Sequence, residues 1–176
     1  EGDILRELWA KDRRKYNFVK YMNEYADVSA FKNTDVTYFS LGEEKWKVML
    51  REMEKAEKYI FLEYFIIGEG KMWGSILEVL KRKAAQGVDV RVMYDGMGCL
   101  TLLPASYPSR LWKMGIKCRV FNPFRPFLST IQNNRDHRKI LVIDGKTAFS
   151  GGVNLSDEYV NITAPYGHWK DTAVML

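Results

Sequence analysis

Two apolar segments separated by an amphipathic one set the main constraint on the fold. Residues 59–67 are apolar on both faces apart from Glu63, as is typical of a central strand. Large apolar residues then recur at helical spacing over residues 73–80, and Gly87 ends the expected helix. Residues 88–94 alternate apolar and polar side chains and predict a second strand. Because a helical crossover brings two strands together in parallel, this run predicts parallel pairing.

Predicted strands and helices alternate along the rest of the chain. A strand at residues 36–41 precedes a helix that begins near Gly42, and a helix at 106–114 precedes a strand at 116–120. A last strand is expected at residues 171–176. The first of these helices would bury a stripe made of Trp46, Met49, Leu50 and Met53. We therefore predict an α/β fold with a mostly parallel, mixed sheet flanked by helices on both faces.

The chain divides into two parts of different character. Residues 1–34 have mixed charge, weak periodicity and a basic cluster at 11–15, and we interpret them as a helical lead-in. A solvated helix is favoured there over one that lies beside a membrane. Residues 35–176 are long enough to form one domain with its own core.

Composition excludes several classes of protein. With 47% hydrophobic residues the chain is not disordered, and no apolar run reaches the roughly 18 residues that a bilayer span needs. A net charge of +5 suits an anionic partner, lipid or nucleic acid, without choosing between them. Cys99 and Cys118 have no neighbours at zinc-ligand spacing, so we expect reduced thiols, no metal site and no cofactor.

The strand that begins at His137 carries the strongest chemical signal. Side chains alternate across a strand, so His137 and Lys139 share one face. An imidazole beside an ammonium suits attack on a phosphate ester, since one group attacks phosphorus and the other neutralises its oxygens. Asp144 and Gly145 form a hairpin-turn signal, and Asp144 lies roughly 16 Å along the strand from the histidine. Spacing alone therefore favours a structural role for Asp144.

The motif H-x-K-x-x-x-x-D from His137 to Asp144, followed by Gly-Gly-Val-Asn at residues 151–154, resembles the phospholipase D superfamily. The segments Leu-Glu-Tyr-Phe-Ile at 62–66 and His-Trp-Lys-Asp-Thr at 168–172 are similar to bacterial cardiolipin synthases. The matched segments follow the family's order over residues 35–176. The resemblance implies one phospholipase D-like half, with membrane helices before it and a second half after it.

The resemblance also implies roles for individual residues. The expected catalytic residues are His137, Lys139 and Asp144. The expected phosphate-binding residues are Lys139, Asn154 and Gly152. Asp171 is expected to orient the histidine.

Several site assignments stay open on the sequence alone. Asp136 and Glu158 compete with Asp171 as the orienting acid, since the sequence does not show which carboxylate is near. Glu63 is charged on an otherwise apolar strand and needs a partner, either Lys139 or a substrate hydroxyl.

Two features are not assigned to the chemistry. His168, the other histidine of the chain, is expected at the rim of the site. The apolar loop at 122–134 either dips into lipid or packs against the second half, and we favour packing.

The activity implied by the resemblance is cardiolipin synthesis. His137 would take a phosphatidyl group from one phosphatidylglycerol and pass it to a second, giving cardiolipin and glycerol. The partners would be phosphatidylglycerol, a membrane surface and the second half, in the same chain or as a homodimer, with no nucleic acid. The intact protein would lie at the bacterial cell membrane with its catalytic domain in the cytoplasm, and the isolated fragment would be soluble and inactive.

Two other functions remain as alternatives. A phosphodiesterase or nuclease of the same superfamily could use water as acceptor and pair two identical chains. A non-catalytic module that keeps only the fold is disfavoured, because His137, Lys139, Asp144 and Asn154 are all present.

Overall fold

The computed structural model describes residues 2–124 and 133–176, and the chain forms two compact units, Glu1–Asp35 and Val36–Leu176. Most of the loop predicted to be apolar, residues 125–132, lies outside the described residues. Within residues 2–124 and 133–176, no helix has both the length and the apolar character that crossing a bilayer requires.

The first unit is a pair of helices, α1 (Gly2–Lys11) and α2 (Arg13–Ala26). The carboxylate of Asp12 caps α2 by accepting hydrogen bonds from the backbone N–H groups of Arg14 and Lys15. Neither helix has a buried residue, so the pair has no core of its own.

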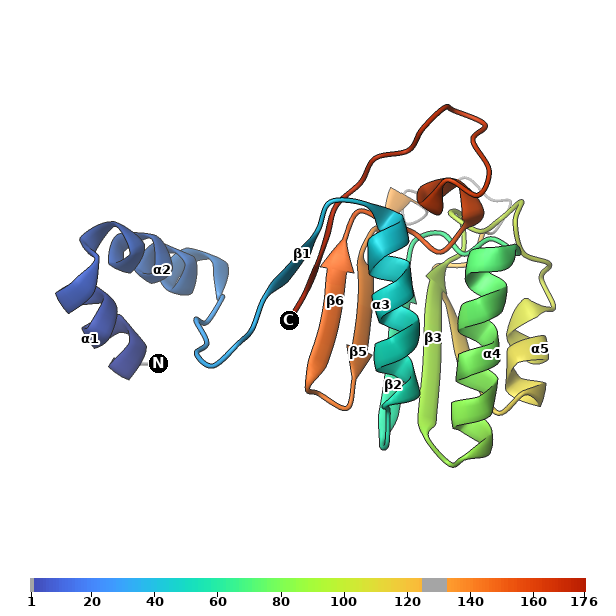
Figure 1. The fold of residues 1–176 in the computed structure, drawn as a ribbon, viewed down its shortest axis with the longest axis horizontal. Helices are drawn as coiled ribbons and strands as arrows, with labels where there is room; N and C mark the ends of the chain where they lie inside the picture. The colour runs from blue at the N-terminus through green and yellow to red at the C-terminus, as the bar shows by residue number, and fades with distance from the viewer. Residues whose placement is uncertain (1, 125–132) are drawn as a thin grey trace. The chain divides into compact units, whose positions relative to one another are not determined.

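The second unit is built on a seven-stranded sheet (Figure 1). Its strands lie in the order β1-β7-β6-β5-β2-β3-β4. Their bounds are β1 Thr37–Phe39, β2 Tyr59–Tyr64, β3 Asp89–Asp95, β4 Lys117–Phe121, β5 Lys139–Ile143, β6 Thr147–Gly151 and β7 Ala173–Met175. The helices are α3 Gly42–Glu54, α4 Lys71–Ala85, α5 Tyr107–Lys113 and the short 3-10 helix η2 Asp157–Val160.

The α/β class is confirmed, and the sheet is mixed as predicted, but two details of the prediction were wrong. Only β2–β3 and β3–β4 pair in parallel, whereas the other four ladders are antiparallel. The hairpins and returning strands after residue 137 account for this, because short connections join antiparallel neighbours. In addition, α3 and α4 lie on the same face of the sheet (Figure 1), and within residues 36–124 and 133–176 no helix covers the other face.

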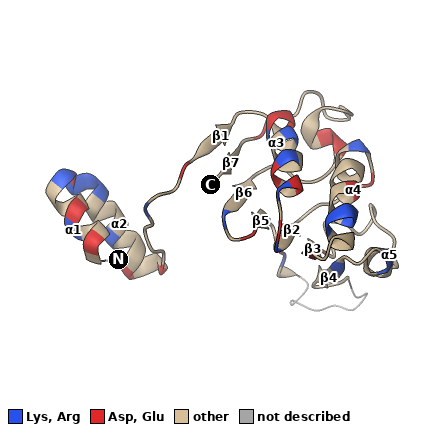
Figure 2. Ribbon diagram, turned by 60° about the horizontal axis from the view of Figure 1, so that its bottom comes forward, with Lys and Arg blue, Asp and Glu red and all other residues tan. Residues whose placement is uncertain are grey.

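The core fills the space between these helices and one face of the sheet. Alternate residues of β2 are buried, namely Ile60, Leu62 and Tyr64, while the residues between them stay partly exposed. Met49 and Met53 of the predicted stripe on α3 are fully buried against this face. The outer sides of α3 and α4 carry interspersed acidic and basic residues (Figure 2).

The central strand β5 fixes the position of the predicted motif. Because β5 runs antiparallel to β2, Lys139 at its beginning is paired with Tyr64 at the end of β2. His137 therefore lies at the edge of the sheet where β2 and β3 end.

Asp144 occupies the opposite end of β5, in the β5–β6 hairpin. It has φ of 54° and Gly145 has φ of 69°, as the predicted two-residue turn requires. Its carboxylate accepts three backbone hydrogen bonds, from the N–H groups of Glu57, Lys58 and Tyr59, each at 2.8 Å. Burial raises the pKa of Asp144, but these three bonds outweigh it and hold the pKa below its ordinary value. The residue ties the hairpin to the start of β2.

We predict that Asp144→Ala lowers the free energy of unfolding at pH 7 by about 2–3 kcal/mol, because three backbone donors lose a charged acceptor. Since the folded-state pKa is depressed, this stability is present above the ordinary pKa of 3.8 and is lost as the pH falls through the lower folded value. Urea unfolding at pH 7 and in acid measures both effects, with Asp144→Asn, which keeps one acceptor oxygen, as the intermediate control. Equal stability of Asp144→Ala and wild type at pH 7 would contradict this role.

Candidate active site

His137 and Lys139 meet at the aromatic ring of Phe65, which follows β2. The ring centroids of Phe65 and His137 are 4.7 Å apart, and Lys139 Nζ lies 5.3 Å from the Phe65 centroid. Lys139 Nζ also donates a hydrogen bond to the His137 carbonyl oxygen at 2.5 Å. The imidazole is exposed, whereas Lys139 is 4% exposed. An accessible nitrogen base therefore stands beside a largely buried cation.

The charge on Lys139 is balanced by nearby carboxylates. Burial lowers its pKa, and the negative charges of Asp171 and Asp136 act against that lowering. A cation held in a partly dry environment interacts with an anion more strongly than one in water. Lys139 can therefore neutralise a phosphate oxygen at this edge.

Asp171 lies directly over Gly152. A Cβ atom built on Gly152 would overlap both carboxylate oxygens of Asp171, so only glycine leaves room for them. Asp171 Oδ1 also accepts the Thr172 backbone N–H at 2.8 Å. The missing side chain of Gly152, expected to allow close approach of a phosphate, instead accommodates the acid.

The other carboxylates face different partners. Asp136 Oδ1 accepts from the backbone N and the Nε of Arg138, and Glu158 accepts from the Ser156 hydroxyl. Of the three candidates for the orienting acid, Asp171 and Asp136 both act on the pKa of Lys139, and the effect of Asp171 is the larger.

The prediction that Lys139 could be the partner of Glu63 was wrong. Glu63 is paired with Ile140 rather than with Lys139, so it projects from the opposite face of the sheet. There its Oε1 forms an ion pair with Arg138 Nη2 at 2.7 Å. Burial raises the pKa of Glu63, as does its contact with Asp136, while Arg138 lowers it. Glu63 is therefore not a contact of a substrate bound at Lys139.

Asn154 is buried beside the same edge. Its Oδ1 accepts the backbone N–H of Ile66 at 3.0 Å, and its side chain also shares a hydrogen bond with Tyr159. The predicted contact of Asn154 with phosphate stays a prediction. The catalytic assignment of Asp144 is corrected, since its carboxylate caps backbone donors at the far end of β5.

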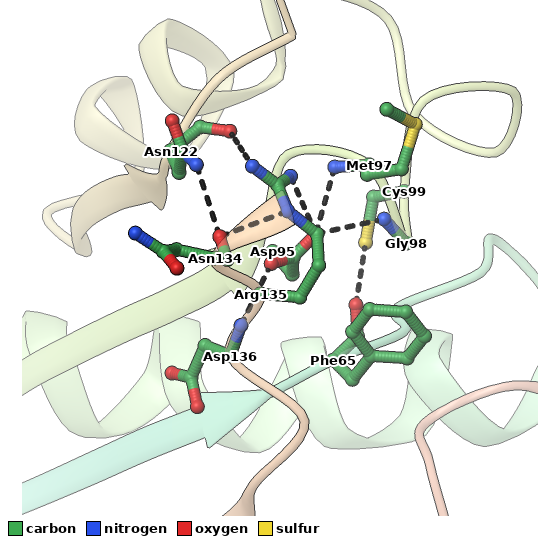
Figure 3. Close-up of polar contacts among 9 residues, drawn as sticks. All are labelled: Phe65, Asp95, Met97, Gly98, Cys99, Asn122, Asn134, Arg135 and Asp136. Carbon is green, nitrogen blue, oxygen red and sulfur yellow. Dashed lines mark hydrogen bonds and ion pairs between the residues drawn. The ribbon is translucent and has the colours of Figure 1, made fainter. Parts of the chain in front are cut away.

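A buried carboxylate, Asp95, anchors the segment that leads into His137 (Figure 3). Asp95 has no exposed surface, and its Oδ2 accepts the backbone N–H of Asp136 at 2.9 Å. Its Oδ1 accepts the N–H groups of Met97 and Gly98 and forms an ion pair with Arg135 at 3.1 Å. The end of β3 thus holds the residue that immediately precedes the exposed imidazole.

Most of this chain matches a known protein family. Residues 49–164 match the family described as "Cardiolipin synthase, PLD-like domain". This chain belongs to that family.

Relatives of this chain are found in several bacteria. The chain is 55% identical over 173 residues, 98% of its length, to an "Uncharacterized protein" of Streptococcus mutans, and 43% identical over 136 residues, 77% of its length, to a "Cardiolipin synthase" of Geobacillus kaustophilus. It spans 38% and 27% of those proteins. The structure of Nuc from Salmonella typhimurium, a phospholipase D family member, has the same fold, with a TM-score of 0.57, 19% identity and coverage of 80% of this chain and 81% of that one.

Sequence analysis missed one residue of this phospholipase D-like domain, Lys45. It lies on the apolar side of α3 and is fully buried, with Nζ at 3.4 Å from the Tyr64 hydroxyl and 3.3 Å from the Val153 carbonyl oxygen. Burial lowers its pKa to about 8, Asp171 acts to raise it, and Lys139 lowers it further. A lysine inside an apolar stripe, one residue before Trp46, was the only signal in the sequence.

We predict that Lys45→Met stabilises the domain at pH 7 by about 3 kcal/mol, since moving a lysine pKa from 10.5 to about 8 costs roughly that much. The unfolded state binds the proton more tightly, so wild-type stability falls as the pH drops from 10.5 to about 8 and then stays lowered. The advantage of Lys45→Met should therefore shrink from pH 8 upward and vanish only above the ordinary pKa of 10.5. Urea unfolding at pH 7 and at about pH 11 measures it, with exposed Lys47→Met as control, and a destabilised Lys45→Met at pH 7 would refute this account.

We further predict opposite effects for two glycine substitutions. Gly152→Ala should displace Asp171 and destabilise the fold by about 1–3 kcal/mol, because the new methyl group overlaps its carboxylate. Gly74→Ala, in α4 with no atom near its added Cβ, should stabilise the fold by about 0.5–1 kcal/mol. Thermal unfolding of the two variants decides the matter, and a neutral Gly152→Ala would mean that Asp171 is not held there.

Proposed function

We propose that the protein containing this chain is a cardiolipin synthase that transfers a phosphatidyl group between two phosphatidylglycerol molecules. The observation that supports it most is the exposed His137 imidazole beside the buried Lys139 ammonium, both against Phe65. Family membership and the relative from Geobacillus kaustophilus support the substrate class.

In the proposed first step, a nitrogen of His137 attacks phosphorus of one phosphatidylglycerol. A P–N bond forms, the P–O bond to the headgroup glycerol breaks, and that oxygen takes a proton from a histidine of the second half. The same histidine then removes a proton from a hydroxyl of the second phosphatidylglycerol. The oxygen of that hydroxyl attacks phosphorus, the P–N bond breaks, and cardiolipin leaves.

Charge balance around Lys139 fits the binding of one phosphodiester. The ammonium groups of Lys45 and Lys139 and the carboxylate of Asp171 interact through a region that is largely removed from water. Asp136 also acts on Lys139 but is paired with Arg138, so two positive charges and one negative charge leave a surplus of one, which a singly charged phosphodiester offsets. In the proposal, Asp171 also holds the imidazole in the tautomer that attacks.

We expect His137→Ala in the full-length protein to lower cardiolipin formation from phosphatidylglycerol by roughly 10³-fold or more, because no other group replaces the nucleophile. Lys139→Met should lower it by roughly 10²-fold or more, whereas Lys146→Met, exposed in the hairpin, should leave it unchanged. Phosphatidylglycerol labelled with ³²P should yield an acid-labile, alkali-stable phosphoprotein in wild type and none in His137→Ala.

Two results would count against the proposal. Activity that survives in His137→Ala would remove the assigned nucleophile. Cleavage of single-stranded DNA by the wild-type protein, with no cardiolipin formed, would favour the nuclease alternative.

A further inference from the structure

The segment between β3 and α5 carries an exposed, uncharged surface. Residues 96–109 contain no acidic or basic side chain, and we call residues 96–105 the apolar turn. Three of its large apolar side chains are substantially exposed, with exposed fractions of 38% for Met97, 47% for Leu100 and 40% for Leu102. Grouped exposure of this kind marks a surface that binds something, because isolated apolar residues on a surface are ordinary but clusters are not.

A cavity of about 220 Å³ opens beside the apolar turn. All the residues that line it are uncharged, and among them are Leu100, Leu103, Val120 and Phe124. This volume is below that of a pocket for a whole drug-sized ligand. The cavity therefore suits the end of one apolar chain better than a compact polar molecule.

The apolar turn is joined directly to the site. Asp95 binds the backbone N–H groups of Met97 and Gly98 with one oxygen and that of Asp136 with the other (Figure 3). Cys99 Sγ, the next residue along, contacts the Phe65 carbonyl oxygen at 3.6 Å, and the Phe65 ring contacts His137. Two short chains of contact thus connect the apolar turn to the imidazole.

We propose that the apolar turn is a lipid-binding surface. Met97, Leu100 and Leu102 enter the acyl region of the bilayer, and the cavity receives part of an acyl chain of the lipid whose phosphate lies at His137. The inference rests on the proposed function, since in a phosphatidyl substrate the acyl chains are a few bonds from phosphorus.

Physical chemistry favours lipid over a protein partner for this surface. Placing a charged side chain in the acyl region is costly, and the apolar turn has none over ten residues. Protein interfaces are instead enriched in aromatic residues, arginine and methionine, whereas leucine is under-represented among their hot spots. Two of the three exposed large side chains of the apolar turn are leucines, and none is aromatic or arginine.

A fluorescent probe tests the location without requiring turnover. Leu102→Cys can be labelled selectively in the full-length protein once any cysteines outside this chain are replaced by serine, because Cys99 and Cys118 are only 2% and 4% exposed. We expect an environment-sensitive probe at position 102 to be quenched by brominated acyl chains in phosphatidylglycerol vesicles. The same probe in Tyr38→Cys, at an exposed apolar position of β1, should not be quenched. Absence of quenching at 102, or equal quenching at both positions, overturns the proposal.

Activity supplies the second test. Met97→Gln with Leu102→Gln should lower the rate on phosphatidylglycerol vesicles by about tenfold or more. The free energy of membrane binding lost when two apolar side chains no longer enter the bilayer exceeds the 1.4 kcal/mol of a tenfold change. The rate on monomeric dihexanoyl-phosphatidylglycerol should be unchanged. Val36→Gln with Tyr38→Gln, exposed elsewhere, is the matched control and should alter neither rate.

The remaining outcomes are distinct. Equal loss on both substrates, or a change in oligomeric size of the Met97→Gln, Leu102→Gln variant, overturns the proposal and indicates a protein contact. If the probe at position 102 is quenched but the wild-type protein forms no cardiolipin, the lipid-binding surface stands and only the proposed function is refuted.

Discussion

The candidate site depends on the buried carboxylate of Asp95. This group sits at the end of β3 and accepts hydrogen bonds from both sides: from the turn that follows β3 and from the segment that enters β5. Because a buried charge without partners is costly, the two segments are held to it and therefore to each other. The loop ahead of His137 ends against the parallel part of the sheet, where Phe65 can meet the imidazole.

The second organising feature is a set of charges beneath that edge. Lys45 from α3, Lys139 from β5 and Asp171 before β7 come from distant parts of the sequence and influence one another's charge. Burial disfavours both ammonium groups, and the carboxylate compensates only in part. Such an arrangement is a cost to folding and a benefit to anion binding, a combination often found at functional sites.

The candidate site was predicted unevenly from the sequence. The shared face of His137 and Lys139 followed from the two-residue alternation of a strand, which is a local property. The placement of Glu63 did not follow, since it depends on which residue of β5 stands opposite it. Lys45 was missed because a lysine within an amphipathic helix is ordinarily exposed. Only packing against Tyr64 and Val153 reveals that it is buried.

The sequence by itself determined the α/β class, the apolar stripe of α3, the Asp144–Gly145 hairpin and the family, because each depends on residue types at short, fixed spacings. The tertiary structure decided the antiparallel majority of the sheet, the face that the helices cover, and which carboxylates act on Lys139. These depend on contacts between residues far apart in the chain, such as Gly152 with Asp171 and Asp95 with Asp136. Local preference carries no information about such contacts until the strands have paired and the burial of each group is set.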